Sequence, residues 1–327
     1  MTTRRHLLVA FGVGALARSL PGFGQQRGKI YRIGFLGAGR APAYAHRIDA
    51  LRTGLRDFGY VEGKNLVIEY RWAEGHYDRL PQLAVEIVGL KIDVLVTHTT
   101  PGTRAARQAS ATLPIVMTDV LDAVGMGLVE SLARPGGNIT GSTLLGPQLN
   151  AKRLEMLKEA LPRIRRVALL VNPSNPALAT IRAEMEMAAK SGKVELREFE
   201  ARQATDLEGA FQTMARIRVD AVIVTEDPVF TVNTGIIANL AINSRLPLAG
   251  FSEFATAGGL IGYGVNFPEL YRRAAYFVDK IIKGAKPAEL PVEQPTKFEL
   301  VVNMKTAKAL GIKIPQSILV RADKVIE

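Results

Sequence analysis

The feature that most constrains the fold of this chain is the regular alternation of short apolar runs with segments that carry one apolar stripe. Residues 30–36 form a largely apolar run, as expected for a strand of a parallel sheet that is buried on both faces. Apolar residues then recur at steps of three and four, which predicts a helix, at Ile48, Leu51, Leu55 and Phe58. A strand followed by a helix is therefore the unit from which this chain is built.

The same unit recurs along the chain, and the pattern restarts near residue 149. Further strands are predicted at 65–71, 92–96, 114–118, 139–144, 166–171, 194–199, 221–225, 247–251, 260–265 and 298–302. Helices between them are predicted at 80–90, 104–109, 128–132, 149–161, 177–191, 207–217, 233–244, 270–282 and 305–310. Repeated strand–helix units imply right-handed crossovers, parallel sheets and helices on both faces of each sheet. The predicted fold class is α/β, with two Rossmann-like lobes.

Length and composition agree with this prediction and exclude several classes of function. The 327 residues are too many for one compact core. The formal net charge is +11, but the basic residues are scattered and no nucleic-acid-binding motif is present, so we expect no nucleic-acid partner. The chain has no cysteine, which excludes disulfides, thiolate metal sites, a cysteine nucleophile and a lipoprotein anchor.

The N-terminal segment has the pattern of an export signal. Arg4 and Arg5 precede an apolar stretch that is too short to span a membrane, and small residues follow at Gly22 and Gly24. Residues 1–24 are therefore predicted to be a cleaved signal peptide, which would place the mature protein in the periplasm. The arginine pair resembles a twin-arginine signal, but general secretion remains an equal alternative.

No constellation of catalytic or metal-binding residues is found in the sequence. The loop at Gly37 and Gly39 follows a strand, but Pro42 stands where the dinucleotide fingerprint needs its third glycine. Phe254 likewise breaks a possible nucleophile elbow at Ser252. No two histidines have the spacing of metal ligands. We therefore expect no catalytic residue, no metal and no cofactor.

The remaining polar clusters follow predicted strands, where each strand leads into a helix. Singly, such residues often cap the next helix. Together, on two lobes that face one cleft, they predict a ligand site, because open α/β sheets bind ligands at the carboxyl ends of their strands. The aromatic residues expected to wall this site are Tyr44, Phe230, Phe251 and Tyr263, with a place in the core as the alternative for each. The predicted polar site residues are Thr99, Thr100, Asp119, Asp122, Asn172, Ser174, Asn175 and Asp227.

The chemistry of these residues suits a zwitterion. Hydroxyls and helix N-termini bind a carboxylate, here at Thr99, Thr100, Ser174 and Asn175. Asp122 or Asp227 can pair with an ammonium group. His98 also follows a strand, and we interpret it as a hydrogen-bonded residue at the strand end rather than as a ligand contact.

Several sequence motifs carry a resemblance to a known family. Three segments carry it: PVEQPTKFELVVNMKTAKALG at 291–311, RPGGNITG at 134–141 and NPSNP at 172–176. Together they resemble the ABC-transporter substrate-binding proteins related to tryptophan/tyrosine-binding lipoproteins. The family usually has Asp-Pro-Val near position 123, whereas this chain has Ala123. The resemblance implies a type I periplasmic binding protein fold, whose lobes are joined by three crossover segments.

The three crossovers imply a division of the chain between the lobes. The first lobe is expected to contain residues 25–145 and 258–287, and the second lobe residues 146–257 and 288–327. The resemblance also implies an exported, monomeric solute-binding component of an ABC importer, which is not an enzyme. It would bind an amino acid or a related small carboxylate and deliver it to an inner-membrane permease with its ATPase. A periplasmic sensory module for a membrane receptor and an enzyme on a similar fold are the alternatives.

Overall fold

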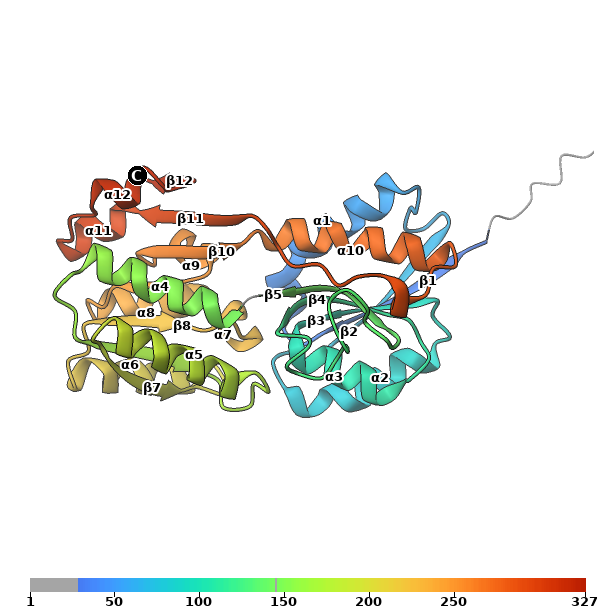
Figure 1. Cartoon of the computed structure of the whole chain (residues 1–327), viewed down its shortest axis with the longest axis horizontal. Helices are drawn as coiled ribbons and strands as arrows, with labels where there is room; N and C mark the ends of the chain where they lie inside the picture. The colour runs from blue at the N-terminus through green and yellow to red at the C-terminus, as the bar shows by residue number, and fades with distance from the viewer. Residues whose placement is uncertain (1–28, 145) are drawn as a thin grey trace, which may run out of the picture.

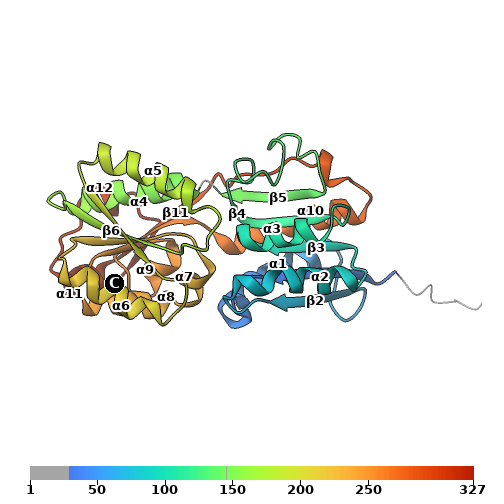
Figure 2. The same ribbon diagram turned by 90° about the horizontal axis from the view of Figure 1, so that it is seen from below.

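The computed structural model describes residues 29–144 and 146–327, which form two α/β lobes joined by three segments (Figure 1 and Figure 2). Each lobe is a twisted sheet with helices on both faces, so the predicted fold class is confirmed. The predicted signal peptide at 1–24 lies outside the described residues. None of the described helices is long and apolar enough to cross a membrane.

The first lobe is built on a five-stranded parallel sheet with the order β2-β1-β3-β4-β5. Its strands are β1 (Tyr31–Gly37), β2 (Leu66–Trp72), β3 (Val94–His98), β4 (Ile115–Leu121) and β5 (Ile139–Leu144). Strands β3 and β4 are buried along their whole length, which explains why each begins with three consecutive apolar residues. The helical elements between the strands are η1 (Ala41–Tyr44), α1 (Ala45–Asp57), η2 (Tyr77–Arg79), α2 (Leu80–Gly89) and α3 (Thr99–Ala109).

The second lobe is built on a seven-stranded sheet with the order β12-β11-β10-β9-β8-β6-β7. Its strands are β6 (Arg166–Val171), β7 (Glu195–Glu200), β8 (Ala221–Val224), β9 (Leu248–Gly250), β10 (Ile261–Val265), β11 (Phe298–Asn303) and β12 (Lys324–Ile326). All neighbours are parallel except β10 and β11. The helices are α4 (Gly146–Ala160), α5 (Leu178–Ser191), α6 (Asp206–Arg216), α7 (Pro228–Val232), α8 (Thr234–Asn243), α9 (Ser252–Thr256), α11 (Met304–Leu310) and α12 (Gln316–Leu319).

The second crossover differs from the prediction, which placed residues 258–287 in the first lobe. Strand β10 pairs with β9 and β11 and so belongs to the second sheet. The chain crosses after Val265, where the Asn266 side chain accepts a hydrogen bond from the Glu269 amide and begins helix α10 (Phe267–Ile282). Helix α10 packs beside α1 on the first lobe (Figure 1). The prediction was therefore wrong for the strand, because an apolar run does not reveal which sheet will pair with it.

The third crossover also lies later than predicted. The backbone amide of Val292 donates to the Leu132 carbonyl at 2.7 Å, and that of Glu293 donates to the Gly141 carbonyl at 2.9 Å. These bonds, together with η3 (Pro287–Glu289) beside β5, hold residues 287–293 on the first lobe. The chain therefore crosses between Gln294 and β11 rather than near residue 288.

The packing of α10 on α1 connects the second crossover to the core of the first lobe. The buried residues of α10 recur at steps of three and four, and its aromatic side chains Phe267, Tyr271 and Phe277 are fully or almost fully buried. Gly54 of α1 lets the helices approach closely, because a Cβ atom there would lie 2.5 Å from the Arg272 carbonyl oxygen. The helix that follows the second crossover is thus packed closely against the first lobe.

Gly141 gives a test of the strand pairing in the first lobe. Its φ is +124°, and a Cβ atom there would lie 2.2 Å from the Met117 carbonyl oxygen. We expect Gly141→Ala to lower the free energy of unfolding by about 2 kcal/mol or more, through backbone strain and overpacking. Urea denaturation followed by circular dichroism measures this change.

Gly209 of α6 supplies the matched control, because its Cβ position is open and its φ is that of a helix. Gly209→Ala should leave stability unchanged or raise it by about 0.5–1 kcal/mol. Equal stability of the two variants would contradict the strand geometry described for Gly141.

Candidate functional site

A small cavity lies between the two lobes, where strands of both sheets end. Its volume is about 20 Å³, counted as the space open to the centre of a water-sized sphere. The start of α3 and the end of β4 border it on one side, and the loop from β8 into α7 borders it on the other. The predicted site residues that the structure brings together around this cavity are Thr99, Thr100, Asp119, Asn175 and Asp227.

The other predicted residues do not line the cavity. Asp122 lies beyond the end of β4, where its carboxylate accepts a hydrogen bond from the Gly125 amide at 2.9 Å and borders a separate pocket. Asn172 and Ser174 line a larger groove beside the cavity. Phe230 is fully buried in the hydrophobic core, and the Tyr263 ring stacks on Phe298. Both aromatic residues therefore serve packing in this structure rather than forming a wall of the cavity.

Asp227 is the most extensively hydrogen-bonded carboxylate of the cavity. As the N-cap of α7 it accepts from the Val229 amide at 2.9 Å, and it accepts from the side-chain amides of Asn172 and Asn175 at 3.1 and 2.9 Å. The Tyr77 hydroxyl of the first lobe donates to its Oδ1 at 2.8 Å. Burial raises the pKa of Asp227, although these donors act against the rise. Asp227 thus holds a direct contact between the lobes.

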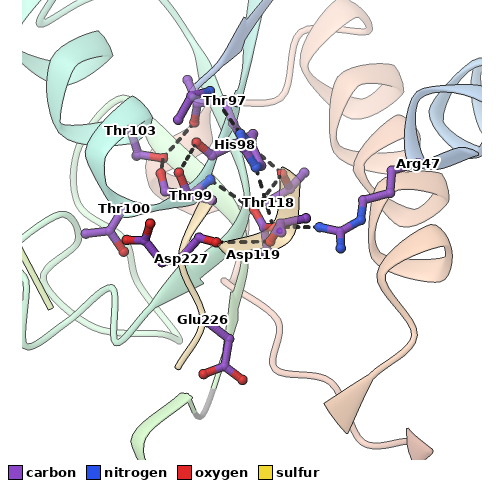
Figure 3. A network of polar contacts seen from close by, with 12 residues as sticks. Arg47, Thr97, His98, Thr99, Thr100, Thr103, Thr118, Asp119, Glu226 and Asp227 are labelled. Atoms are coloured by element: carbon purple, nitrogen blue, oxygen red, sulfur yellow. Dashed lines mark hydrogen bonds and ion pairs between the residues drawn. The ribbon is translucent and has the colours of Figure 1, made fainter. Parts of the chain in front are cut away.

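Asp119 is the centre of a second polar cluster, on the first lobe (Figure 3). Its Oδ1 accepts from the Thr99 amide at 2.9 Å, and its Oδ2 lies 3.5 Å from an Arg47 nitrogen. Burial raises the pKa of Asp119 to about 6, and the charge of Arg47 limits that rise. Asp119 and Thr99 both have positive φ, +37° and +64°. Strained backbone of this kind is concentrated at functional sites.

His98 lies behind Asp119 and is fully buried. Its Nδ1 accepts from the Ala38 amide at 3.1 Å, so its proton is on Nε2, which lies 4.0 Å from Asp119 Oδ2. Burial and the nearby Arg47 hold the pKa of His98 well below its usual value. The histidine is therefore neutral and hydrogen-bonded at the end of its strand, as the sequence predicted.

Arg47 joins the two lobes on the other side of the cavity, and the sequence analysis did not identify it. Its Nη2 lies 2.8 Å from Glu253 Oε1 of α9, and its guanidinium stacks over the Phe267 ring at 3.9 Å. Burial is the largest single influence on the pKa of Glu253 and would raise it, but the charge of Arg47 and the hydrogen bonds to the carboxylate together outweigh burial and lower the pKa to about 2. The sequence could have identified Arg47 as a buried charge by its position, because it lies one helical turn before Leu51, on the apolar face of α1.

Glu226 is held by a third cluster, inside the second lobe. Arg153 of α4 contacts Glu226 Oε1 at 2.5 Å, and it also donates to Asn150 and to the Tyr263 carbonyl. Three carboxylates line the cavity, those of Asp119, Glu226 and Asp227, against one guanidinium group, that of Arg47. The excess of acceptors and negative charge suits a cationic group of a solute.

The described carboxylates of the cavity each have hydrogen-bond or ion-pair partners. No group of three or more histidine or acidic side chains in the described part of the chain could hold a metal ion. The carboxylates of the cavity are bonded to amides, hydroxyls and arginines, which orients them as binding groups.

Comparisons with known proteins agree on one family. The model of the family described as ABC transporter substrate binding protein matches residues 40–326. A tyrosine-binding protein from Clostridioides difficile (strain R20291) is 26% identical over 261 residues, which are 79% of this chain and 74% of the relative.

Two solved structures are similar over 91% of this chain and 100% of their own. A conserved domain protein from Vibrio cholerae superposes with a TM-score of 0.86 at 30% identity. An ABC domain in complex with L-Trp from Streptococcus pneumoniae superposes with a TM-score of 0.84 at 25% identity.

The raised pKa of Asp119 predicts a specific dependence of stability on pH. The carboxyl has a pKa of about 6 in the folded chain and 3.8 as its ordinary value, so the folded state takes up the proton first. This residue therefore adds stability as the pH falls from about 6 to about 4, and it costs stability above pH 6. We expect Asp119→Asn to reduce this pH dependence, measured as urea midpoints at pH 4.5 and 7.5.

Asp122→Asn is the control, because Asp122 lies outside the cavity. It should keep the pH dependence of the parent. An Asp119→Asn variant with the same difference between the two midpoints as the parent would contradict the assignment.

Proposed function

Because the chain belongs to the family of ABC transporter substrate-binding proteins, we propose that it binds an amino acid or a related small carboxylate between its lobes. Members of this family are solute-binding proteins, not enzymes, and they work with an ABC permease and its ATPase. We propose further that this protein is exported to the periplasm, acts as a monomer and serves import. A relative named for tyrosine binding and a similar structure in complex with L-Trp support an amino acid as the solute.

The observation that carries this proposal is the position of Asp227, a buried carboxylate at a cavity to which both lobes contribute. An ammonium group is the natural partner of such a carboxylate in a site with more acids than arginines. The solute carboxylate is assigned to the start of α3. There the Thr100 Oγ1 accepts from the Leu121 amide at 3.1 Å, which leaves its own proton free to donate. Backbone N–H groups at a helix start favour an anion.

Binding on this proposal requires the lobes to move. The cavity of about 20 Å³ is close to the size of one water molecule, so it is too small to admit an amino acid. The Arg47–Glu253 and Tyr77–Asp227 contacts would break when the lobes part. The three segments that join the lobes allow such hinge motion, as in other two-lobed binding proteins.

Removal of the Asp227 charge tests the site. We expect Asp227→Asn to weaken binding of the amino acid by about ten- to hundredfold, because a charge-assisted hydrogen bond contributes roughly 1.5–3 kcal/mol. The measurement is calorimetric titration of the parent and the variant with each of the twenty L-amino acids. Circular dichroism verifies that both proteins are folded.

Asp122→Asn is again the matched control, and it should bind as the parent does. Equal affinity of the parent and the Asp227→Asn variant would overturn the assigned ammonium site. Absence of binding by the parent to all twenty amino acids would overturn the proposed class of solute.

Lobe closure is tested by small-angle X-ray scattering. The radius of gyration should fall when the protein is saturated with the amino acid that binds most tightly, because solute contacts with both lobes favour the closed state. An unchanged radius of gyration at a concentration where calorimetry shows full occupancy would contradict the hinge mechanism.

A further inference from the structure

Arg47 is the one positively charged side chain among the described residues that line the cavity between the lobes. The other charged side chains of this lining are the carboxylates of Asp119, Glu226 and Asp227. A solute carboxylate in the cavity therefore meets three groups of its own charge, which is unfavourable. The start of α3 offers it hydrogen-bond donors but no charged side chain. The guanidinium of Arg47 is thus the available counter-charge for a carboxylate.

Aromatic rings hold the guanidinium of Arg47 in position. The residue is fully buried, and its guanidinium carbon lies 3.9 Å from the centre of the Phe267 ring and 5.1 Å from that of Tyr44. A ring against a planar guanidinium stabilises the charge and leaves the N–H groups at its edges for hydrogen bonds to carboxylates. The charge is therefore positioned before any solute arrives.

The hydrogen bonds of Arg47 leave part of its edge without a partner. Its Nη2 lies 2.8 Å from Glu253 Oε1, and its Nη1 lies 3.5 Å from Asp119 Oδ2, which is long for a hydrogen bond. The other oxygen of Glu253 accepts from the Ser252 hydroxyl at 3.1 Å. The buried Nε of Arg47 has no hydrogen-bond partner among the described residues, which costs free energy. A carboxylate that bound Nε and Nη2 together would satisfy this edge completely.

The opening of the lobes separates Glu253 from Arg47, because α9 belongs to the second lobe and α1 to the first. Asp119 stays beside Arg47 on the first lobe. The Thr99 amide bonds the other oxygen of Asp119 at 2.9 Å, so the guanidinium and the start of α3 lie on either side of one carboxylate (Figure 3). Thr100, whose hydroxyl proton is free to donate, lines the same cavity. A solute carboxylate at the start of α3 is therefore close to Arg47.

We propose that Arg47 is the counter-charge of the solute carboxylate, and that Glu253 binds this guanidinium in the closed arrangement and releases it when the solute binds. This inference rests on the proposed function and deepens it, because it names the charged group that completes the carboxylate site. Arg47 and Asp227 then bind the two charged groups of an α-amino acid, its carboxylate and its ammonium. Glu253 competes with the solute for Arg47.

Comparison of an amino acid with its α-amide tests the role of Arg47. The probes are the L-amino acid that the parent binds most tightly among the twenty and its primary α-amide, which keeps the ammonium and lacks the carboxylate charge. The titrations are done at pH 6.5, below the usual α-amino pKa of about 7.7–8.0, so that the amine of both probes is protonated. We expect the parent to bind the acid at least about tenfold more tightly than the amide, measured by calorimetry.

Arg47→Met keeps a long unbranched side chain and removes the charge. The preference for the acid over the amide should fall to about threefold or less. A role only in packing or in joining the lobes would lower the affinity for both probes equally, so an unchanged ratio would overturn the inference. Since Arg47→Met leaves buried acids without a partner, the double variant Arg47→Met/Glu253→Gln is measured as well. It should show the same loss of preference, and circular dichroism verifies that each protein is folded.

Glu253→Gln tests the competition. It removes the charge that Glu253 offers to Arg47, so the preference for the acid over the amide should rise by about three- to tenfold. The ratio of the two affinities is the measurement, because a change in lobe opening alone affects both probes alike. An unchanged or lower preference would overturn the competitive role of Glu253.

Arg52 and Glu62 provide the matched controls. Arg52 lies on the same helix α1, and its Nε donates to Glu62 Oε2 at 3.0 Å, but neither is among the described residues that line the cavity. Arg52→Met and Glu62→Gln should each keep the preference of the parent. If the parent binds the acid and the amide equally, the inference is overturned while the proposed binding of an amino acid stands. If the parent binds none of the twenty amino acids, both are overturned.

Discussion

The buried guanidinium of Arg47 is the interaction on which the arrangement of the two lobes depends. A buried positive charge without a partner costs several kcal/mol, so it needs carboxylates close by. Asp119 provides one from the first lobe and Glu253 provides another from the second. A buried ion pair contributes little net stability after the cost of removing its charges from water. This contact therefore specifies the relative position of the two lobes but adds little free energy in its favour. On the proposed hinge mechanism, the lobes would part at a modest cost in free energy.

The position of Asp119 depends in turn on an irregularity in the first sheet. The register between β4 and β5 shifts between Met117 and Val120, and Gly141 lies opposite this shift. Since Gly141 has no side chain, β5 can approach the Met117 backbone to a distance that a Cβ atom would forbid. Irregularities of this kind redirect nearby side chains. Here the strand delivers a carboxylate to the edge of the cavity, so a feature of strand packing determines the chemistry of the site.

The local charge of the site is opposite to the charge of the whole chain. The sequence carries a formal net charge of +11, yet three carboxylates and one guanidinium group line the cavity between the lobes. The basic residues are distributed over the surface, where water screens them, whereas the buried carboxylates act at short range in a medium of low polarity. The net charge of the chain therefore says little about the solute, and the few buried groups say much more.

The sequence by itself determined the α/β lobes and the edge of each sheet at which the site lies. Both follow from local patterns, since the spacing of apolar residues defines strands and helices, and parallel strands bring their carboxyl ends to one edge. Thr99, Asp119 and Asp227 could be predicted as neighbours because each follows a strand or stands near its end.

The tertiary structure alone decided which distant segments meet. Strand β10 has the same apolar character as a strand of the first sheet, and only its pairing with β9 and β11 assigns it to the second. Arg47, Tyr77 and Glu253 lie in helical elements whose local sequence carries no clear signal of a site, and they make their contacts between the lobes only because the two lobes face each other. Phe230 and Tyr263 looked like walls of the site, but their neighbours in space make them part of the packing. The physical reason is that a local pattern reports on residues a few positions apart, whereas contacts between lobes join residues up to 206 positions apart.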